Sequence, residues 1–326
     1  MRAPDFWTRP PGAAAYALAP LGALYGLAGR LRQALARPWR APVPVICVGN
    51  LVAGGAGKTP VALAVMERLL ARGITAQFLS RGHGGSLEGP LRVAPHHTAA
   101  EVGDEPLLLA DVAPAWISAD RAAGARAMVA AGARAIIMDD GFQNPGLAKD
   151  LSLLVVDGAV GFGNGMILPA GPLREPVSAG LARAHGLVLV GGAQTGLAAR
   201  LPSALPLLRA RLEPDAAVVA ALAGRPVLAF AGIGRPSKFF ETCRAAGLRL
   251  ADMVPFPDHH PYSRAELAAL LDRAAALGAR PLTTAKDASR LPAELRDHVS
   301  VLPVRLVLDD PSALDDLLEP VLHGQA

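Results

Sequence analysis

The stretch Cys47–Pro60, CVGNLVAGGAGKTP, constrains the fold of this chain more than any other, because it is rich in glycine and ends in the tripeptide GKT followed by proline. A short apolar run, Pro44–Asn50, leads into it, and an Ala/Leu-rich run, Pro60–Gly73, follows it. A strand, a glycine-rich turn and a helix in this order form a phosphate-binding loop, with the N-terminus of the helix directed at the anion. The sequence therefore predicts a nucleotide site on an α/β sheet.

The loop departs from the usual spacing G-x-x-x-x-G-K-[ST], because valine stands where the first glycine is expected. Three glycines remain, which is enough for a tight turn whose backbone N–H groups converge on phosphate oxygens. The lysine would neutralise the β- and γ-phosphates, and the threonine hydroxyl would bind Mg²⁺. A glycine-rich turn with a chance GKT is the alternative. The expected nucleotide contacts are Val52, Ala53, Gly54, Gly55, Ala56, Gly57, Lys58 and Thr59.

Two classes of switch NTPase fit this loop poorly. Partition-type ATPases carry a second lysine early in the loop, where this chain has Ala53. GTPases read their base with an N-K-x-D motif, and the nearest sequence here is TAKD at Thr284–Asp287, with the wrong spacing. A membrane-associated NTPase that acts as a switch, without a lipid acceptor, remains the alternative function.

Short apolar β-branched runs alternate with helical runs along most of the chain, which predicts a mostly parallel sheet covered by helices on both faces. A second series of such runs begins near Pro226. The Leu/Pro/Arg-rich stretch Leu197–Pro214 is the candidate boundary. We expect a membrane-associated helix over residues 1–36, a P-loop domain over residues 37–212 and a smaller α/β domain over residues 213–326.

The N-terminal run Gly12–Ala28 carries no charge and is flanked by arginines. A signal peptide would contain a similar apolar run, but export would remove the nucleotide site from cytosolic ATP. A spanning helix needs about 20 apolar residues, and this run is shorter, poor in large side chains and interrupted by Pro20. The pattern favours a helix in the membrane interface, with Leu21 and Leu24 on its apolar side and the arginines on anionic lipid. An Ala-rich helix packed on the domain is the remaining possibility.

Carboxylates follow two of the apolar runs. Asp139 and Asp140 stand where a strand ends, as the second Mg²⁺ ligand of a P-loop requires, although a polar turn would look the same. Asp104 and Glu105 begin a helical run, where they are either a cap or the base that takes a proton from an acceptor hydroxyl.

Three further loops carry chemistry-bearing residues. In FPDHHPY, Asp258, His259 and His260 could be a ligand set, a catalytic element, a solvated turn or part of a metal phosphoesterase site. In GPLREP, Arg174 could stabilise a transferring phosphoryl group, or form a surface ion pair with its neighbour. SRGHGG is either a substrate-contacting loop or a plain turn.

Composition limits the partners and the compartment. Lys+Arg 32 minus Asp+Glu 28 gives a net charge of +4, which suits anionic ligands but is too small and too dispersed to indicate nucleic acid. Only four of the 32 basic residues are lysines. The two cysteines, Cys47 and Cys243, form neither a metal-binding spacing nor a disulfide framework, so a reducing cytosol is expected.

Taken together, these motifs resemble the tetraacyldisaccharide 4'-kinase family of lipid A biosynthesis. The matching segments are VGNLVAGGAGKTP, LSRGHGG, GDEP, DDGFQN, GPLREP, AGIGRPSKFF, FPDHHPY and TTAKDASRL, in the order of the family and spanning Val48 to Leu291. The resemblance implies Mg²⁺-dependent transfer of the ATP γ-phosphate to the 4'-hydroxyl of a tetraacyldisaccharide 1-phosphate, giving lipid IVA. It also implies a position at the cytosolic face of the bacterial inner membrane, with no nucleic acid and no obligate protein partner.

The resemblance also implies roles for individual residues. Asp104 is similar to the general base of the family, and His259 to the histidine that supports it. Lys58 and Arg174 would neutralise charge during the transfer. The expected metal positions are Thr59, Asp139, Asp140 and Glu175, and the expected acceptor contacts are Arg81, His83 and Gln143. The chain departs from the family pattern at three positions, where His83 replaces an expected tyrosine, Ala285 a glutamate and Arg235 an asparagine.

Overall fold

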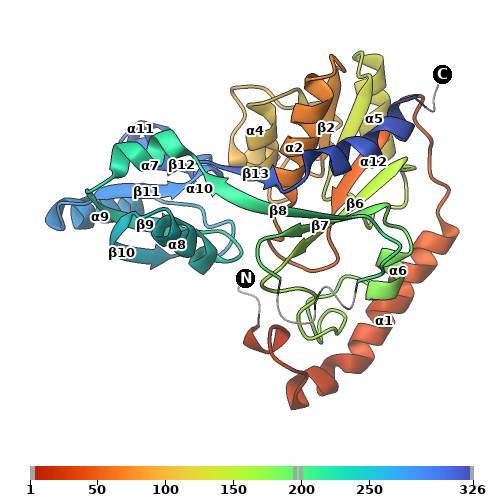
Figure 1. Cartoon of the computed structure of the whole chain (residues 1–326), viewed down its shortest axis with the longest axis horizontal. Coiled ribbons are helices and arrows are strands. Elements are labelled where there is room, and N and C mark those ends of the chain that lie inside the picture. Colours follow the sequence, from red (N-terminus) through yellow and green to blue (C-terminus); the bar gives the residue numbers. More distant parts are fainter. Residues whose placement is uncertain (1–3, 194–196, 198–200, 324–326) are drawn as a thin grey trace.

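The computed structural model describes residues 4–193, 197 and 201–323, and its strands form two sheets (Figure 1). Part of the expected boundary stretch and the last three residues of the chain lie outside the described residues. The nine strands of the larger sheet, in spatial order, are β13 (Val304–Leu308), β8 (Leu207–Pro214), β7 (Gly186–Val190), β6 (Leu151–Asp157), β1 (Val45–Gly49), β5 (Ala135–Asp139), β2 (Ala76–Ser80), β4 (Ala115–Ile117) and β3 (Leu91–Arg92).

The seven central strands of this sheet, β8 to β4, are parallel, and only the edge strands β13 and β3 run antiparallel to their neighbours. Strands β1, β5, β6 and β7 are buried along their whole length, as expected for a parallel sheet covered on both faces. The helices that belong to this sheet are α2 (Lys58–Leu70), α3 (Ala99–Val102), α4 (Asp104–Ala110), α5 (Arg121–Ala130), α6 (Val177–Leu181) and α12 (Pro311–His323). The predicted P-loop fold with a mostly parallel sheet is confirmed.

The second sheet has four parallel strands in the order β10 (Arg249–Pro255), β9 (Pro226–Ala231), β11 (Arg280–Thr284) and β12 (Ser300–Leu302). Its helices are α7 (Ala216–Leu222), α8 (Pro236–Ala245), α9 (Arg264–Ala276), α10 (Ala285–Ala288) and α11 (Ala293–Arg296). Alternate residues of β9 enter different cores, because side chains alternate across a strand. Ala229 packs in the core that holds Phe239 of α8, and Phe230 packs in the core that holds Leu267 of α9. Helices therefore cover both faces of this small sheet.

The chain crosses between the two sheets twice, through β8 and β13 (Figure 1). These strands pair antiparallel, with Leu308 opposite Ala210, so the last strand returns to the larger sheet. Helix α12 follows it and buries Leu314 and Leu318 in the large core. This arrangement differs from the expected contiguous C-terminal domain over residues 213–326. We propose instead a larger unit of residues 37–214 and 303–323 and a smaller unit of residues 215–302, since each then contains one sheet and its helices.

Helix α1 (Ala13–Leu35) lies beside the larger sheet and packs through its small residues (Figure 1). A Cβ at Gly22 would lie 2.8 Å from the carbonyl oxygen of Ile167, so the close approach of helix and loop requires glycine there. Its large apolar side chains face solvent: Leu24 is 63% exposed and Leu35 is 81% exposed. Pro20 lies within the helix without ending it. Among the described residues, no helix combines the length and the apolarity needed to cross a membrane.

Candidate active site

The phosphate loop connects the buried strand β1 to helix α2. Gly54 (φ 113°) and Gly57 (φ 86°) adopt positive φ angles, which only glycine adopts without strain. The helix begins at Lys58, two residues earlier than the apolar pattern suggests, so Lys58 and Thr59 lie in its first turn. The N–H groups of a first turn have no partners within the helix and can point at an anion. The valine in place of the usual first glycine is accommodated: Val52 forms a β-bridge with Leu173.

Asp139 ends β5, the strand beside β1, and its side chain is buried. The Thr59 hydroxyl donates a hydrogen bond to Asp139 Oδ2 (3.1 Å), while Asp139 Oδ1 is buried without a hydrogen-bond partner in the described structure. Burial, reinforced by the charge of Glu105, raises the pKa of Asp139 above the ordinary value of a carboxyl group. The Thr59 hydroxyl and the unpartnered Oδ1 of Asp139 are oxygen ligands of the kind that Mg²⁺ prefers.

Asp140 follows with a positive φ of 51° and points its carboxylate at two cations. Arg174 donates from both terminal nitrogens, to Oδ1 (2.8 Å) and Oδ2 (3.2 Å), and Lys58 Nζ lies 3.7 Å from Oδ2. Burial opposes ionisation, but the charges of Lys58 and Arg174 outweigh it and hold the pKa of Asp140 below its ordinary value. Both carboxylate oxygens are therefore already engaged by Arg174, which fixes the guanidinium beside the phosphate loop.

Glu175 lies in a polar network next to this pair. Gln143 Nε2 donates to Glu175 Oε1 (3.0 Å) and to the carbonyl oxygen of Asn50 (2.8 Å), and Arg183 pairs with Glu175 Oε2. The Arg183 guanidinium in turn lies over the ring of Phe142, 4.6 Å from its centroid. The network ties the loop after β5 to the start of the phosphate loop.

Asp104 is the first residue of α4 rather than its cap, and its side chain is buried. His259 Nδ1, which comes from the smaller unit, lies 2.9 Å from Asp104 Oδ2. Burial by itself would raise the pKa of Asp104, but the hydrogen bond from His259 and the charges of Lys286 and Arg290 hold the pKa below its ordinary value. A buried, ionised carboxylate bonded to a histidine can accept a proton from an acceptor hydroxyl.

His259 is held in an uncommon backbone conformation (φ 57°). Together with Asp140 it is one of two non-glycine residues with positive φ in the described part of the chain. Such conformations persist where the surrounding structure imposes them, and they concentrate at functional sites. The Lys286 ammonium lies 3.4 Å from His259 Nε2, which suits a proton on Nδ1 facing Asp104. One of these residues, Asp140, lies at the phosphate loop, and the other, His259, lies at the Asp104 carboxylate.

Several charged residues of the site were not identified from the sequence. Lys286 donates to Glu105 Oε1 (3.0 Å), and Arg290 Nε lies 3.3 Å from Asp104 Oδ2. In the larger unit, Arg121 is 4% exposed, its Nε is buried without a hydrogen-bond partner, and burial lowers its pKa to about 10. The sequence held one signal that could have identified Lys286, since it is one of only four lysines in the chain.

The loop after β2 contributes the remaining predicted residues. The ring of His83 meets the ring of His259 edge-on, with centroids 5.8 Å apart. Arg81 is exposed, and its charge acts on Arg121. Among the positions that depart from the family pattern, His83 thus lies beside His259, and Arg235 lies 3.4 Å from Asp157 at the end of β6.

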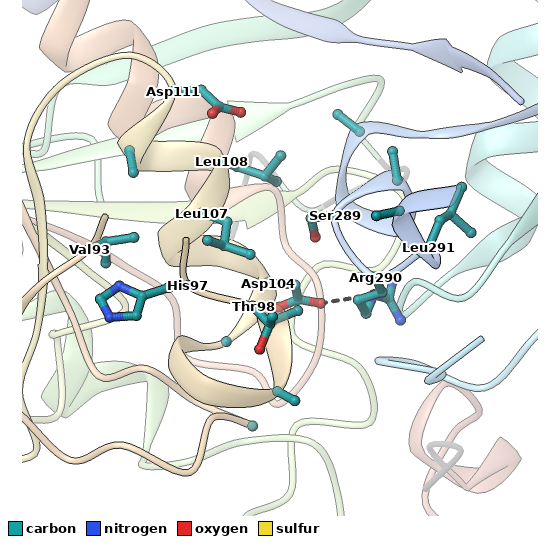
Figure 2. Close-up of a pocket in the computed structure, with 18 of the residues that line it drawn as sticks. Val93, His97, Thr98, Asp104, Leu107, Leu108, Asp111, Ser289, Arg290 and Leu291 are labelled. Carbon is teal, nitrogen blue, oxygen red and sulfur yellow. Dashed lines mark ion pairs between the residues drawn. The ribbon is translucent and has the colours of Figure 1, made fainter. Parts of the chain in front are cut away.

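Two cavities adjoin these groups. A cleft of about 1110 Å³ lies between α4 and the α10–α11 region, and Figure 2 shows Leu107 and Leu108 on one side of it and Ser289 and Leu291 on the other. Asp104 and His259 are among its lining residues. A second pocket, of about 430 Å³, lies between helix α1 and the loop after β5. Its lining includes Tyr25, Arg30 and Gln33 of α1, and Gln143, Arg174, Glu175 and Arg183 of the larger unit.

The fold and the site define a P-loop phosphotransferase of the kinase type, with a nucleotide cradle and a carboxylate–histidine pair suited to deprotonate an acceptor. Comparison with known proteins narrows the class. The model of the family described as tetraacyldisaccharide-1-P 4'-kinase matches residues 14–323. The tetraacyldisaccharide 4'-kinase of Rhodospirillum centenum is 60% identical over 336 residues, covering 100% of each chain. That of Gluconacetobacter diazotrophicus is 57% identical over 321 residues, covering 98% of each chain.

A solved structure agrees with this assignment. A crystal structure of LpxK from Aquifex aeolicus in complex with ATP matches with a TM-score of 0.74 and 26% identity, covering 95% of this chain and 99% of that chain. The chain belongs to the tetraacyldisaccharide-1-P 4'-kinase family, a family of lipid A biosynthesis, and the resemblance read from its motifs is confirmed.

Proposed function

We propose that this chain transfers the γ-phosphoryl group of ATP to the 4'-hydroxyl of a tetraacyldisaccharide 1-phosphate, giving the 1,4'-bisphosphate. One observation carries the proposal: the Asp104–His259 pair, joined across the two units, stands near the carboxylates at the end of β5, beside the phosphate loop. The charge of Glu105, next to Asp104, acts on Asp139, so the two groups of residues share one region. Family membership favours this lipid kinase activity over a switch NTPase.

The phosphate loop, Lys58 and Arg174 bind and neutralise the triphosphate. The first-turn amides of α2 point at the phosphates, and Lys58 adds a charge that is fixed by Asp140. Thr59 and Asp139 would hold Mg²⁺, which would neutralise negative charge on the triphosphate. We assign Asp140 and Glu175 supporting roles, because arginines already engage both carboxylates. Asp140 orients Arg174, and Glu175 orients Gln143.

Asp104 accepts the proton of the sugar hydroxyl as the hydroxyl oxygen bonds to the γ-phosphorus; the bond from the γ-phosphorus to the β-phosphate oxygen breaks, and ADP leaves. The carboxylate is ionised at neutral pH, and the hydrogen bond from His259 keeps one of its oxygens in a fixed direction. The Asp104 carboxylate is buried, which limits the access of competing water, so the proton passes from the acceptor rather than from solvent. His83, beside His259, and Gln143, in the second pocket, are suited to contact the acceptor headgroup.

The glycolipid reaches this site from a membrane surface. The exposed leucines of α1 offer an apolar strip, and Arg30 and Arg32 lie on the same helix near its C-terminal end. The second pocket joins this helix to Arg174, which would let a headgroup leave the interface and approach the phosphate loop while its acyl chains stay in lipid. Since ATP is cytosolic, we place the enzyme at the cytosolic face of the inner membrane.

Phosphate transfer to lipid tests this function directly. With γ-labelled ATP and tetraacyldisaccharide 1-phosphate in mixed micelles, the wild-type chain is expected to label the lipid. Asp104→Asn should lower kcat by about 10²- to 10⁴-fold, because general-base catalysis is lost, while the Kd for ATP stays unchanged. Asp111→Asn, an exposed carboxylate on the turn after α4, is the matched control and should keep wild-type turnover.

The fate of the label separates the alternatives. Label released as phosphate at a rate independent of the lipid would support a switch NTPase and contradict the proposal. Wild-type turnover in Asp104→Asn, with label still passing to the lipid, would remove Asp104 as the base without removing the kinase activity.

A further inference from the structure

Arg290 is a buried cation of the smaller unit that reaches the catalytic carboxylate of the larger one. It lies in the turn after α10, its side chain is 6% exposed, and its Nε is 3.3 Å from Asp104 Oδ2. Figure 2 shows the two side chains meeting across the cleft, Asp104 from the α4 side and Arg290 from the α10–α11 side. A buried arginine is rare unless it is paired, so its position requires an explanation.

The Nε–H of Arg290 donates to the carbonyl oxygen of Lys286 (3.4 Å), one of four hydrogen bonds by which the smaller unit holds this arginine. Its NH1 donates to the carbonyl oxygen of His260 (3.0 Å), and its NH2 donates to the carbonyl oxygen of Gly232 (2.9 Å) and to Asp287 Oδ1 (2.7 Å). Because the guanidinium is planar and its donors are fixed relative to one another, these bonds determine where Nε lies. The nitrogen that meets Asp104 is therefore placed by the smaller unit.

Asp287 organises this arrangement from a fully buried position. Its Oδ1 accepts from the Gly232 amide (2.8 Å) and from the Tyr262 hydroxyl (2.7 Å) as well as from Arg290. The same glycine accepts a hydrogen bond at its carbonyl oxygen from the amide of His259 (3.1 Å). One buried ion pair thus fixes both the loop that carries the catalytic histidine and the arginine that meets the catalytic carboxylate.

We propose that Arg290, held by Asp287, is a positioning residue for the phosphoryl transfer, which orients the Asp104 carboxylate against His259 when the two units are together. This inference rests on the proposed role of Asp104 as the base. Arg290 contacts neither phosphate nor acceptor in this assignment. It acts through Asp104, by fixing the direction of one carboxylate oxygen and by keeping the carboxylate ionised.

The charged groups around Asp104 determine the expected sign of a pH effect. From the smaller unit, His259, Lys286 and Arg290 face it, whereas Asp258 contacts His259 instead; from the larger unit, Glu105 adjoins it on the same helix. His83 reaches it only through the His259 ring. The cations hold the pKa of Asp104 below its ordinary value, so removing one of them raises that pKa. The acid limb of the kcat/KM profile should then move to higher pH.

The experiment uses the full chain with two substitutions at one position. Arg290→Met removes both charge and hydrogen bonds, and we expect kcat to fall about 10- to 100-fold, as for other misplaced catalytic groups. The acid limb of the kcat/KM profile of this variant should shift to higher pH by about one unit, while the Kd for ATP stays within about twofold of wild type. Arg290→Lys keeps the charge but cannot reach all five oxygen partners of the guanidinium, so it should restore the acid limb and leave kcat about tenfold low.

Arg249→Met is the matched control, because Arg249 is an exposed arginine at the start of β10 in the smaller unit and is not among the residues that line the cleft. It should keep both kcat and the pH profile of the wild type. Wild-type kcat in Arg290→Lys, or equal losses of kcat and ATP affinity in both Arg290 variants, would overturn the inference, since the residue would then be dispensable or merely structural. If Arg290→Met does not fold, Arg290→Lys decides the question by the same criterion. Loss of turnover in Asp104→Asn alongside a silent Arg290→Lys would overturn this inference and leave the proposed function intact.

Discussion

Asp139 and Asp104 are both buried carboxylates, but their surroundings differ. Asp104 is bonded to a histidine and lies near two cations, and its pKa is lowered. Asp139 has a hydroxyl on one oxygen and no hydrogen-bond partner within the described structure on the other, and burial raises its pKa. A buried charge without full compensation costs stability, and such costs are retained where a ligand later supplies the missing charge. At the scale of single residues, Asp139 is therefore where we expect stability and function to oppose each other.

Replacing Asp139 by asparagine should separate its effect on stability from its effect on activity. Because the folded-state pKa is raised, ionising Asp139 costs stability as the pH rises through that pKa, and the variant escapes this cost. In Mg²⁺-free buffer at pH 8, we expect Asp139→Asn to raise the free energy of unfolding by about 1–3 kcal/mol. This gain should vanish below about pH 4, where carboxyl groups are protonated in both states. Denaturant unfolding at both pH values measures it.

The same variant should lose about 100-fold or more in kcat, because it lacks the carboxylate that we propose as a ligand of the activating metal. Asp272→Asn, an exposed carboxylate on α9, is the control and should change stability by less than about 0.5 kcal/mol. A destabilised Asp139→Asn that still turns over with Mg²⁺ would refute this assignment.

Among the elements, α1 has an unusual distribution of side chains. The residues that pack on the larger unit are small, such as Gly22 and Gly26, whereas its leucines and tyrosines are exposed. A helix that merely completed a hydrophobic core would bury its large side chains, because their burial contributes most of the free energy. The exposed strip therefore supports contact with lipid, and the glycines allow the helix to lie close to the loop around Ile167.

Charging this strip should weaken membrane association while leaving nucleotide binding intact. The double variant Leu21→Glu/Leu24→Glu should reduce co-sedimentation with vesicles of anionic phospholipid by about tenfold or more, since each buried leucine contributes about 1.5–3 kcal/mol. Activity on vesicle-borne acceptor should fall in parallel, with an unchanged Kd for ATP. Leu277→Glu, at another exposed leucine (44%) in the smaller unit, is the control. Equal sedimentation of all three proteins would indicate that the strip serves another purpose.

Across the whole molecule, the two units are joined at their charged edges. Lys238 of α8 donates to Asp157 Oδ2 (2.8 Å), at the end of β6, and Lys286 donates to Glu105. A Cβ at Gly234 would lie 3.0 Å from the amide nitrogen of Gly55, so the smaller unit also approaches the phosphate loop itself. The position of the smaller unit is thus coupled to the loop that binds the nucleotide.

Weakening the contact between the two units should change nucleotide binding at the phosphate loop. Lys238→Gln removes a partly buried ion pair, and we expect the KM for ATP to rise up to about tenfold, equivalent to about 1.4 kcal/mol. Amide hydrogen exchange should increase in residues 50–57 and 232–238, because these segments face each other. Arg244→Gln, on the exposed last turn of the same helix, is the control. Unchanged exchange in the phosphate loop would show that the ion pair does not couple the units.

Much of the fold could be predicted from the sequence, because the relevant signals are local. The continuous apolar runs predict buried parallel strands, and the glycines of the loop predict the tight turn that begins α2. The return of β13 and α12 to the larger sheet could not be predicted, since β13 pairs with β8 some 90 residues earlier in the chain. No property of residues 304–323 alone distinguishes a strand of one sheet from a strand of the other.

The same distinction between local and long-range features applies to the candidate active site. By itself, the sequence determined the phosphate loop, the carboxylates at the end of β5 and the family, because each depends on residue types at fixed spacing. The family resemblance already paired His259 with Asp104, but only the tertiary structure decided that Lys286 and Arg290, 182 and 186 residues further along the chain, add their charges to this pair. The physical reason is that spacing fixes backbone geometry within a loop, whereas the ionisation of a buried carboxylate depends on every charge packed around it.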